Sequence, residues 1–467
     1  MGSKTTHILY VVGLSFAVGF VIVEFPVLSE PDVMKTWGIL LLMFLFYCLS
    51  LKQLTDVDRL RFTIGTTVWW FLFFAEAVLV RRGTIEKAAE GIFARAAFGE
   101  ATIWIACVFL LAFISLGKPG YLNILFRASY KWITLFTMFV LASVAYSPDP
   151  IYSLAWALKL AVIVVSLAMW ASAVNNLEDI QKFLEIIHIA FLVTVMMPFF
   201  QLLADPSLLF MGGRLGGIFA PTGVSAEGGV LLLLSLILSR VNGKRSSFYK
   251  VTSIIGLVIM LLGGGKAAIV AGIVSGIAFF MILGEALSSI GFIVLVSLLS
   301  LITFALKLPI VMYLHYYQES DLLWTLTGRL PLWAAAVGAI LERPLVGHGY
   351  VASKLSSLLI QGVRWPAGHM HNAFLEVLYN NGILGLVPIL LMNLAIVKNI
   401  IGVIRRPLNK SVLILAAGLL ALYIFLFLNG IFTTSFGGRP HNEFMLFLAL
   451  IALSDKLRRV STNELSR

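Results

Sequence analysis

The amino-acid sequence predicts an all-α, polytopic integral membrane protein with about 12–14 transmembrane helices and one large extracytoplasmic loop that contains short helices. Three observations lead to this fold class. Hydrophobic residues make up 60% of the 467 residues, charged residues make up only 12%, and apolar runs recur along nearly the whole chain. Such a composition lies far outside the range of soluble domains.

The apolar runs place the spans in order along the chain, because the hydrocarbon core of a bilayer needs about 20 apolar residues per helix. The first run is too long for the core of a signal peptide, so we expect it to be a retained signal anchor. The predicted spans lie near residues 8–28, 33–51, 60–80, 101–117, 130–147, 153–174, 183–203, 223–239, 249–263, 267–283, 286–308, 372–397, 411–430 and 438–453.

These spans divide the chain into three regions. Residues 1–308 are expected to hold about eleven transmembrane helices, and residues 371–467 about three more. Between them, residues 309–370 form a large extracytoplasmic loop that is too rich in Leu and Trp to be disordered. Long loops in compact proteins are usually functional. We therefore expect short helices on the outer face, one of them starting near Thr327 or Gly328, and we expect the chemistry to take place there.

The net charge of +11 indicates how the protein is oriented in the membrane. Lys and Arg are concentrated in alternate short loops, which the positive-inside rule assigns to the cytoplasm, and this rule puts both termini there. The rule does not cover the long segment 309–370. The distribution of charge therefore predicts an active site on the extracytoplasmic side, with membrane lipids as partners and no nucleic acid.

Metal and nucleotide sites have little support in the sequence. Both cysteines, Cys48 and Cys107, fall inside predicted spans, where they are better interpreted as small apolar residues. The chain contains no HExxH, CxxC or DxD motif, so no metal is expected. The "GGGK" stretch that ends at Lys266 lacks both the spacing of a P-loop and its following Ser or Thr.

Several cations and histidines fall on the extracytoplasmic side, often at the edges of spans, where a charge is costly unless it is paired or hydrated. Neighbouring glycines let backbone N–H groups approach a ligand, and Arg supplies a planar fork of donors for phosphate. The pattern indicates a site for an anion with several oxygens. The residues concerned are Arg214, Lys266, Arg329, His348, His369, His371, Arg439 and His441.

Each of these cations also has a simpler structural interpretation. Arg214 could reach the interface by snorkelling, although the glycines beside it are not needed for that. Lys266, at the start of a span, fits either interpretation, and Arg329 could pair with nearby acidic residues. Arg439 and His441 are more simply interpreted as residues of the membrane interface.

His371 and Asn372 stand together at the predicted start of the span near 372–397. Burial and the positive end of a helix would keep this imidazole uncharged, and a neutral histidine is a suitable proton acceptor at physiological pH. The alternative is an interfacial residue or a helix cap. His369 lies two residues earlier, so the two rings should face opposite sides of a helix, which argues against a zinc pair.

Acidic residues in or near spans are the strongest feature in favour of a transporter, because intramembrane carboxylates often relay protons. Glu376 is the one nearest His371, and it could equally pair with an arginine on the outer face. A transporter would also be expected to show two halves related by an internal repeat. The long loop has no counterpart in the first half of the chain.

Four stretches follow one another in a recognisable order. They read "YSPDPIYSLAWALKL" (146–160), "GRLGGIFAPTG" (213–223), "LTGRLPLWAAAVGAILERPLVGHGY" (326–350) and "HNAFLEVLYNNGILG" (371–385). In the last stretch, His-Asn is followed after nine residues by Gly382 and then by Gly385. Together the four resemble the O-antigen ligase and polymerase superfamily of bacterial membrane glycosyltransferases, and the third looks like a segment of its exopolysaccharide polymerases.

The resemblance implies a multi-span fold with a large periplasmic loop before the last spans. It also implies an inverting, metal-independent and cofactor-free transfer of a glycan carried by undecaprenyl diphosphate. Lys266 stands where the family commonly has an arginine, and Lys cannot give bidentate contacts to phosphate. The predicted site is His371 as the catalytic general base, with Arg214, Arg329, Lys266, Asn372 and His348 as residues that bind the diphosphate or the glycan.

The loop motif favours a polymerase, which would join O-antigen or exopolysaccharide repeat units and use a glycan as acceptor. The alternatives within the family are an O-antigen ligase, whose acceptor is the lipid A core, and a protein O-oligosaccharyltransferase. Outside the family, the alternative is a polysaccharide transporter or flippase. A chain-length regulator is a further partner that the resemblance allows.

Overall fold

The computed structural model of the protein describes residues 122–204, 210–211, 214–216, 220–305, 329–353, 369–406 and 409–465, together with Trp69. Within these residues the chain is almost entirely helical, and β structure is confined to the short hairpin of β1 (Phe210–Met211) and β2 (Arg214–Leu215). The predicted all-α, multi-pass membrane fold is confirmed. Apart from Trp69, the four predicted spans between residues 8 and 117 lie outside the described residues.

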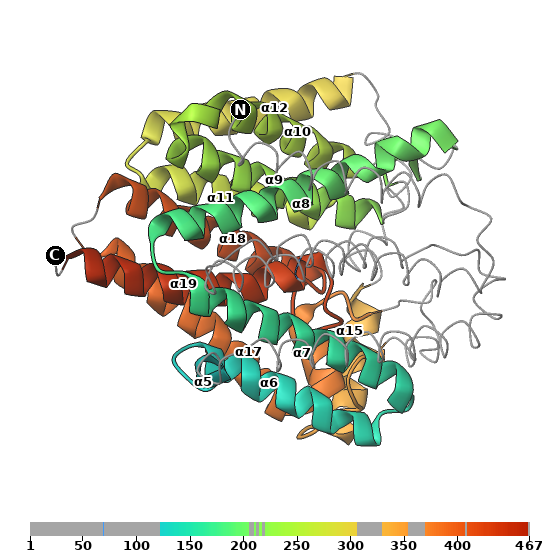
Figure 1. The fold of residues 1–467 in the computed structure, drawn as a ribbon. Coiled ribbons are helices and arrows are strands. Elements are labelled where there is room, and N and C mark those ends of the chain that lie inside the picture. Colours follow the sequence, from blue (N-terminus) through green and yellow to red (C-terminus); the bar gives the residue numbers. More distant parts are fainter. Residues whose placement is uncertain are drawn as a thin grey trace.

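Each predicted span from residue 130 onward corresponds to a helix (Figure 1), although α8 begins earlier and α17 and α19 continue further than expected. Five of the described helices, α7, α9, α10, α17 and α18, are long and apolar enough to cross a membrane. In chain order the helices are α5 (Leu122–Leu125), α6 (Tyr130–Ser143), the 3-10 helix η3 (Val144–Tyr146), α7 (Pro150–Ala173), α8 (Leu177–Ala204), α9 (Pro221–Val241), the 3-10 helix η5 (Gly243–Arg245), α10 (Ser246–Gly263), α11 (Lys266–Ile282), α12 (Ala286–Ala305), α15 (Arg329–Glu342), α17 (Ala373–Ile404), α18 (Lys410–Phe432) and α19 (Asn442–Leu465).

Capping residues set several of these helix boundaries. α7 has Pro150 at its first position, and the carboxylate of the preceding Asp149 accepts a hydrogen bond from the Tyr152 N–H (3.0 Å). Asn409 caps the start of α18 in the same manner, and α10 stops at Gly264, whose φ of 63° is left-handed. A helix leaves its first N–H groups and last carbonyls without internal partners, so such residues fix where it begins and ends.

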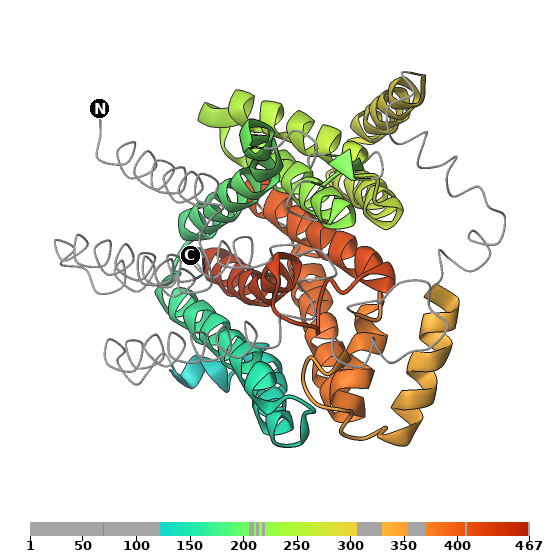
Figure 2. The same cartoon turned by 90° about the vertical axis from the view of Figure 1, so that its right-hand side faces the viewer.

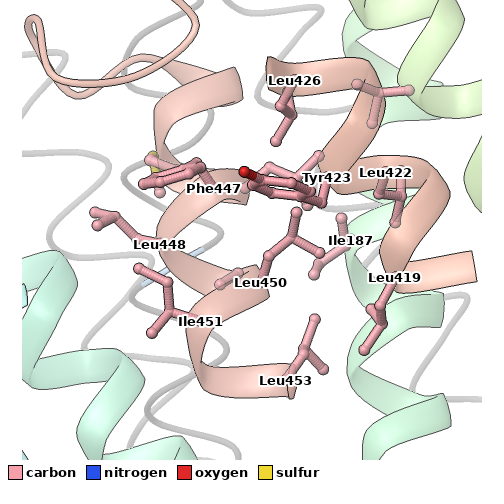
Figure 3. Packing of buried hydrophobic residues seen from close by; sticks show 14 of the residues in the cluster. Ile187, Leu419, Leu422, Tyr423, Leu426, Phe447, Leu448, Leu450, Ile451 and Leu453 are labelled. Atoms are coloured by element: carbon pink, nitrogen blue, oxygen red, sulfur yellow. The ribbon is translucent and has the colours of Figure 1, made fainter. Parts of the chain in front are cut away.

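α18 and α19 lie in the middle of the bundle, between the group formed by α9 to α12 and the group formed by α6 and α7 (Figure 2). Figure 3 shows the apolar side chains that fill the space around them. Packing contacts hold such helices together in lipid, since burial there gives little hydrophobic gain. The labelled residues are Ile187 of α8, Leu419, Leu422, Tyr423 and Leu426 of α18, and Phe447, Leu448, Leu450, Ile451 and Leu453 of α19.

α9 and α10 pack with their backbones almost in contact. A Cβ added at Gly228 would lie 2.6 Å from the Met260 backbone nitrogen, and one added at Gly256 would lie 2.6 Å from that of Leu232. Small residues at a helix interface permit this approach, which is common between membrane helices. The two helices therefore form a closely packed pair, and β2 packs against both of them.

Helix connections collect at two ends of the bundle. At one of them, which we call the basic end, Lys456 of α19 donates from Nζ to the Val174 carbonyl (3.2 Å) after α7. Asn242, after α9, donates to Glu185 near the start of α8 (2.8 Å). The basic end carries Lys182, Arg240, Arg245, Lys250, Lys398, Arg405, Arg406, Lys410, Lys456, Arg458 and Arg459.

The opposite end, which we call the site end, holds the starts of α7, α9, α11, α17 and α19. The Tyr146 hydroxyl, just before α7, donates to the Val346 carbonyl (2.7 Å) in the segment that follows α15. Asn442, the first residue of α19, donates to Glu227 in the second turn of α9 (2.9 Å). These contacts bring together stretches that are far apart in the sequence.

α17 is broken at Gly382, whose φ of 60° and ψ of −163° are not helical. The segment 343–349, which follows α15, fills the break and replaces hydrogen bonds that the interrupted helix loses. A Cβ at Gly382 would lie 2.3 Å from the Leu345 carbonyl oxygen, so only glycine fits there. The backbone hydrogen bonds run from Ile383 to Pro344 (2.8 Å), from Leu384 to Leu345 (3.1 Å), from His348 to Tyr379 (2.9 Å) and from Gly349 to Asn380 (2.8 Å).

α15 starts at Arg329, directly after the predicted start at Thr327 or Gly328. It lies beside α17 (Figure 2), and Leu332 and Ala336 on its apolar face belong to the same packed cluster as Tyr379 of α17. Residues 309–328 and 354–368, the rest of the predicted loop, lie outside the described residues.

Candidate active site

The turn before α17 presents His371 and is held by the cap of that helix. Asn372 is the N-cap residue, and its Oδ1 accepts hydrogen bonds from the N–H groups of Phe374 (2.9 Å) and Leu375 (3.0 Å). His371 itself has a φ of 50°, a left-handed conformation that few residues other than glycine adopt. Such strain persists only where the surroundings hold it, and it is often found at functional sites.

Glu376 provides much of that support from inside α17. Its buried carboxylate accepts a hydrogen bond from the Met370 N–H (2.8 Å), from the Ser353 hydroxyl and from the Asn380 amide (3.2 Å). The carboxylate thus connects the turn at His371 to the segment after α15 and to the next turn of α17. These contacts are those of a structural anchor.

His369 and His371 lie side by side, with ring centroids 3.9 Å apart. The expectation that their rings face opposite sides of a helix is wrong, because both precede α17 and the left-handed turn folds one ring toward the other. The backbone N–H of His371 donates a hydrogen bond to Nδ1 of His369 (3.2 Å). Because Nδ1 of His369 accepts this hydrogen bond, a neutral His369 carries its proton on Nε2, which is then a donor. His371 is therefore the candidate base of the pair.

Burial lowers the pKa of His371 to about 4, and the positive charge of nearby Arg329 adds to the effect. The imidazole is therefore uncharged at neutral pH, as expected from the sequence. Burial is the first cause in both cases, but the second cause is the charge of Arg329 and not the positive end of a helix. An uncharged ring can accept a proton, and a protonated one cannot.

Arg329 is brought to His371 by α15, of which it is the first residue. Trp333, one turn further along, donates from Nε1 to the Met370 carbonyl (2.9 Å) and so fixes α15 against the histidine turn. The Arg329 guanidinium carbon lies 6.0 Å from the ring centroid of Phe432, at the end of α18, and such a contact orients the planar group. The predicted pairing of Arg329 and His371 in one site thus agrees with their placement.

Arg439 and His441, from the segment that leads into α19, join this group. Burial lowers the pKa of His369 well below its usual value, and electrostatic interactions with His371, Arg439, His441 and Arg329 lower it further. Both residues are half-buried, and their electrostatic effect on His369 places them beside the histidine pair. The sequence held one signal of this, since "RPHN" (439–442) repeats the pattern of "HMHN" (369–372) directly before a helix.

Arg214 and Lys266 reach the site end through other contacts. Arg214 lies in β2, which packs on α9 and α10, and it is partly buried. Lys266 is the exposed first residue of α11, and the preceding Gly265 N–H donates to the Ser225 hydroxyl in α9 (3.0 Å). The start of α9 is in turn joined to α19, so both cations lie at the same end as His371. Their contact with a diphosphate stays a prediction.

His348 and Asn372 have structural contacts. Nε2 of His348 lies 2.9 Å from the Ala339 carbonyl, and the ring stacks on Tyr379 with centroids 4.6 Å apart. His348 thereby connects α15 to α17 near the break at Gly382. The side-chain oxygen of Asn372 caps α17, which is the alternative that the sequence had left open. Their predicted contact with substrate remains untested.

The site thus combines an uncharged imidazole with two guanidinium groups, all at the start of α17. Guanidinium groups stabilise negative charge that develops on phosphate oxygens, and an imidazole can remove a proton from a hydroxyl group. Among the described residues, no group of three or more His, Cys, Asp or Glu is arranged to hold a metal ion.

A comparison with protein families identifies part of this structure. Residues 251–390 match the family model described as O-antigen ligase. The match runs from α10 to the kinked part of α17 and includes Lys266, Arg329 and His371. Arg214 and Arg439 lie outside it. No curated protein matches the chain.

Proposed function

This chain carries an O-antigen ligase domain of the O-antigen ligase and polymerase superfamily, and from that premise we propose that it is an inverting glycosyltransferase of the bacterial inner membrane. Its donor is a glycan carried by undecaprenyl diphosphate, and its acceptor is a sugar hydroxyl group. Chain extension of O-antigen or exopolysaccharide repeat units is the form of the reaction that we favour.

The distribution of charge supports a periplasmic active site. The basic end carries most of the described Lys and Arg residues, and the positive-inside rule assigns such an end to the cytoplasm. His371, Arg329 and Arg439 lie at the opposite end. The lipid-linked glycan would therefore be bound from the periplasmic side, with its polyprenyl tail between helices in the bilayer.

In the proposed reaction, the acceptor hydroxyl oxygen attacks the anomeric carbon of the donor sugar. The bond between that carbon and the phosphate oxygen breaks, and undecaprenyl diphosphate leaves with the electron pair. His371 takes the hydroxyl proton, so the imidazole becomes imidazolium and no further reactant is needed. Attack from the face opposite the leaving group inverts the anomeric configuration.

Arg329 would stabilise the diphosphate as it takes up negative charge. This interaction strengthens in the transition state, because the phosphate oxygens are most negative once the bond to the sugar has broken. Arg214 and Lys266 are proposed to bind the same diphosphate, with Lys266 as a point charge that lacks the fork of an arginine.

The observation that carries the proposal is the placement of Arg329 beside an uncharged His371. A proton acceptor and a phosphate-binding group are the two functions that glycan transfer from a lipid diphosphate requires. The carboxylate of Glu376 accepts hydrogen bonds from three groups of the protein, which favours a structural anchor over the proton relay of a transporter.

An O-antigen ligase is the second candidate, because the family model that matches residues 251–390 bears that description. A ligase would use the same base and the same diphosphate contacts and would differ in its acceptor, the lipid A core. The two reactions therefore differ in which molecule presents the hydroxyl group to His371.

The test uses the purified full chain in lipid nanodiscs with a defined undecaprenyl-diphosphate glycan. Release of undecaprenyl diphosphate together with a longer glycan, when a second lipid-linked unit is the acceptor, is the expected result. Transfer to lipid A core alone would identify a ligase instead. In proteoliposomes, movement of unaltered lipid-linked glycan across the bilayer without transfer would show a flippase and contradict the proposal.

A further inference from the structure

The segment that leads into α19 supplies the site with a cation that the matched family segment does not include. Arg439 lies outside residues 251–390, and it is 70 residues from His369 in the sequence. It nevertheless lies close enough to His369 for its charge to affect that ring. Arg439 is therefore part of the site because it lies near the His369 ring, although it is distant in the sequence.

Two features hold the backbone at Arg439 against the start of α17. Gly437 has a φ of 81°, and a Cβ there would lie 2.1 Å from a methyl group of Val377, so glycine is required for this approach. The Tyr350 hydroxyl donates to the Gly438 carbonyl (2.8 Å). This segment is thus fixed by the same elements that position His371.

The side chain of Arg439 is oriented as well. Its guanidinium carbon lies 5.7 Å from the ring centroid of Trp156 in α7, and Arg329 contacts Phe432 in a comparable way. A guanidinium packed against an aromatic face loses less conformational freedom when it binds a ligand. Two arginines from different elements are therefore prepared for planar contacts near the histidine pair.

Two guanidinium groups, those of Arg329 and Arg439, supply the positive charge of this place. They come together with His369, His371 and His441, and their charge disfavours the protonation of the neighbouring His369 ring.

Two described carboxylates lie near these groups, and both accept hydrogen bonds within the protein; the charge of Arg439 also acts on one of them, that of Glu376. Glu376 accepts hydrogen bonds from three groups, and Glu443 accepts from Ser435 (2.5 Å) and Asn429 (3.2 Å) while lying 3.9 Å from Nε2 of His441. A concentration of cations in a low-dielectric place favours the binding of an anion from outside.

We propose that Arg439 is a second phosphate-binding residue of this site and holds a phosphate group of a lipid-linked substrate on the His369 side. The inference rests on the proposed function for the identity of that substrate. The phosphate belongs either to the donor diphosphate or to the acceptor, since an acceptor on a lipid carrier also brings phosphate to the site. The chemistry of recognition is the same for both.

The experiment measures two quantities for the full chain in nanodiscs, and the first requires no turnover. Binding of inorganic pyrophosphate is measured by calorimetry for the wild type and for Arg439→Gln, with Arg406→Gln at the basic end as a control that loses the same charge. The dissociation constant is expected to rise about tenfold or more in Arg439→Gln and to stay unchanged in Arg406→Gln. Arg439→Lys, which keeps the charge and lacks the fork, provides a second variant and should lie between the two.

The second quantity is the KM of the Arg439 variants for the lipid-linked donor and for the acceptor, each varied separately. A higher KM for the donor assigns the phosphate to the departing diphosphate, and a higher KM for the acceptor assigns it to the acceptor lipid.

Pyrophosphate binding that is absent in the wild type, or unchanged in both Arg439 variants, would overturn the inference even if transfer proceeds. Binding that depends on Arg439 without any transfer would support the inference while refuting the proposed function.

Discussion

The Met370 backbone N–H donates a hydrogen bond of 2.8 Å to Oε2 of Glu376, whose side chain is only 3% exposed. Met370 stands between His369 and His371, so this contact fixes the turn from which both rings project. Hydrogen bonds to a buried carboxylate are among the stronger ones in proteins. The position of the proposed base thus depends on an acidic residue that does not itself take part in the chemistry.

Glu376→Gln should lower the rate of glycan transfer by about ten- to a hundredfold, because a small displacement of a catalytic group is costly. The amide that replaces one carboxylate oxygen cannot accept hydrogen bonds from all three donors. Since the change displaces the base and leaves the cations in place, kcat should fall while KM for the donor stays nearly constant. Glu285→Gln at the basic end is the matched control, and a rise in KM alone would contradict the positioning role.

Gly382→Ala should destabilise the protein, because the left-handed φ and the nearby Leu345 carbonyl leave no room for a methyl group. Strain and overpacking together should cost about 2–4 kcal/mol of the free energy of unfolding. Gly402→Ala, in the last turn of the same helix, is the control, since a Cβ there meets nothing within 4 Å. Thermal unfolding should show a lower midpoint for the first variant only, and equal midpoints would contradict the account of the break in α17.

The sequence predicted the helices of the described part well, and the reason is physical. Each span is an apolar run of fixed minimum length, so α7, α9, α10 and α18 could be placed from composition alone. The break in α17 could not be placed, because the backbone hydrogen bonds that stabilise it come from the segment after α15. That segment lies more than thirty residues earlier in the chain.

The candidate site was predicted in part. His371 and Arg329 were expected in one place, and the structure brings them together. From the sequence, His369 and His371 are expected to face opposite sides of a helix, and Arg439 and His441 are expected at the membrane interface. The first expectation is wrong because the histidine pair lies in a turn before a helix, where the left-handed residue His371 redirects a side chain that helical periodicity would point elsewhere.

The rate of transfer should depend on pH with two different midpoints. Protonation removes the base, so kcat/KM, which reports the free enzyme, should be constant from pH 7 to about 5 and fall as the pH drops through the pKa of His371, about 4. A bound diphosphate offsets the charge of Arg329 and so raises that pKa. The kcat profile should therefore fall at a higher pH than the kcat/KM profile, and coincident midpoints near 6.5, the ordinary value for histidine, would contradict this account.

Arg329→Lys should reduce kcat/KM by about ten- to a hundredfold although the charge is kept, because Lys lacks the planar fork that matches phosphate. Arg329→Gln should in addition shift the acid limb of the kcat/KM profile upward, since it removes a positive charge that lowers the pKa of His371. Arg343→Lys, at the exposed far end of α15, is the control. Normal kinetics in both Arg329 variants would leave the diphosphate contact without support.

The proposed reaction is tested most directly by the initial rate of transfer from an undecaprenyl-diphosphate glycan, measured for the wild type and for His371→Ala in the same nanodiscs. The rate should fall by about 10²–10⁴-fold, as expected for loss of a general base, while the variant keeps its thermal unfolding midpoint and still binds pyrophosphate. A folded His371→Ala protein that transfers glycan at the wild-type rate would contradict the account.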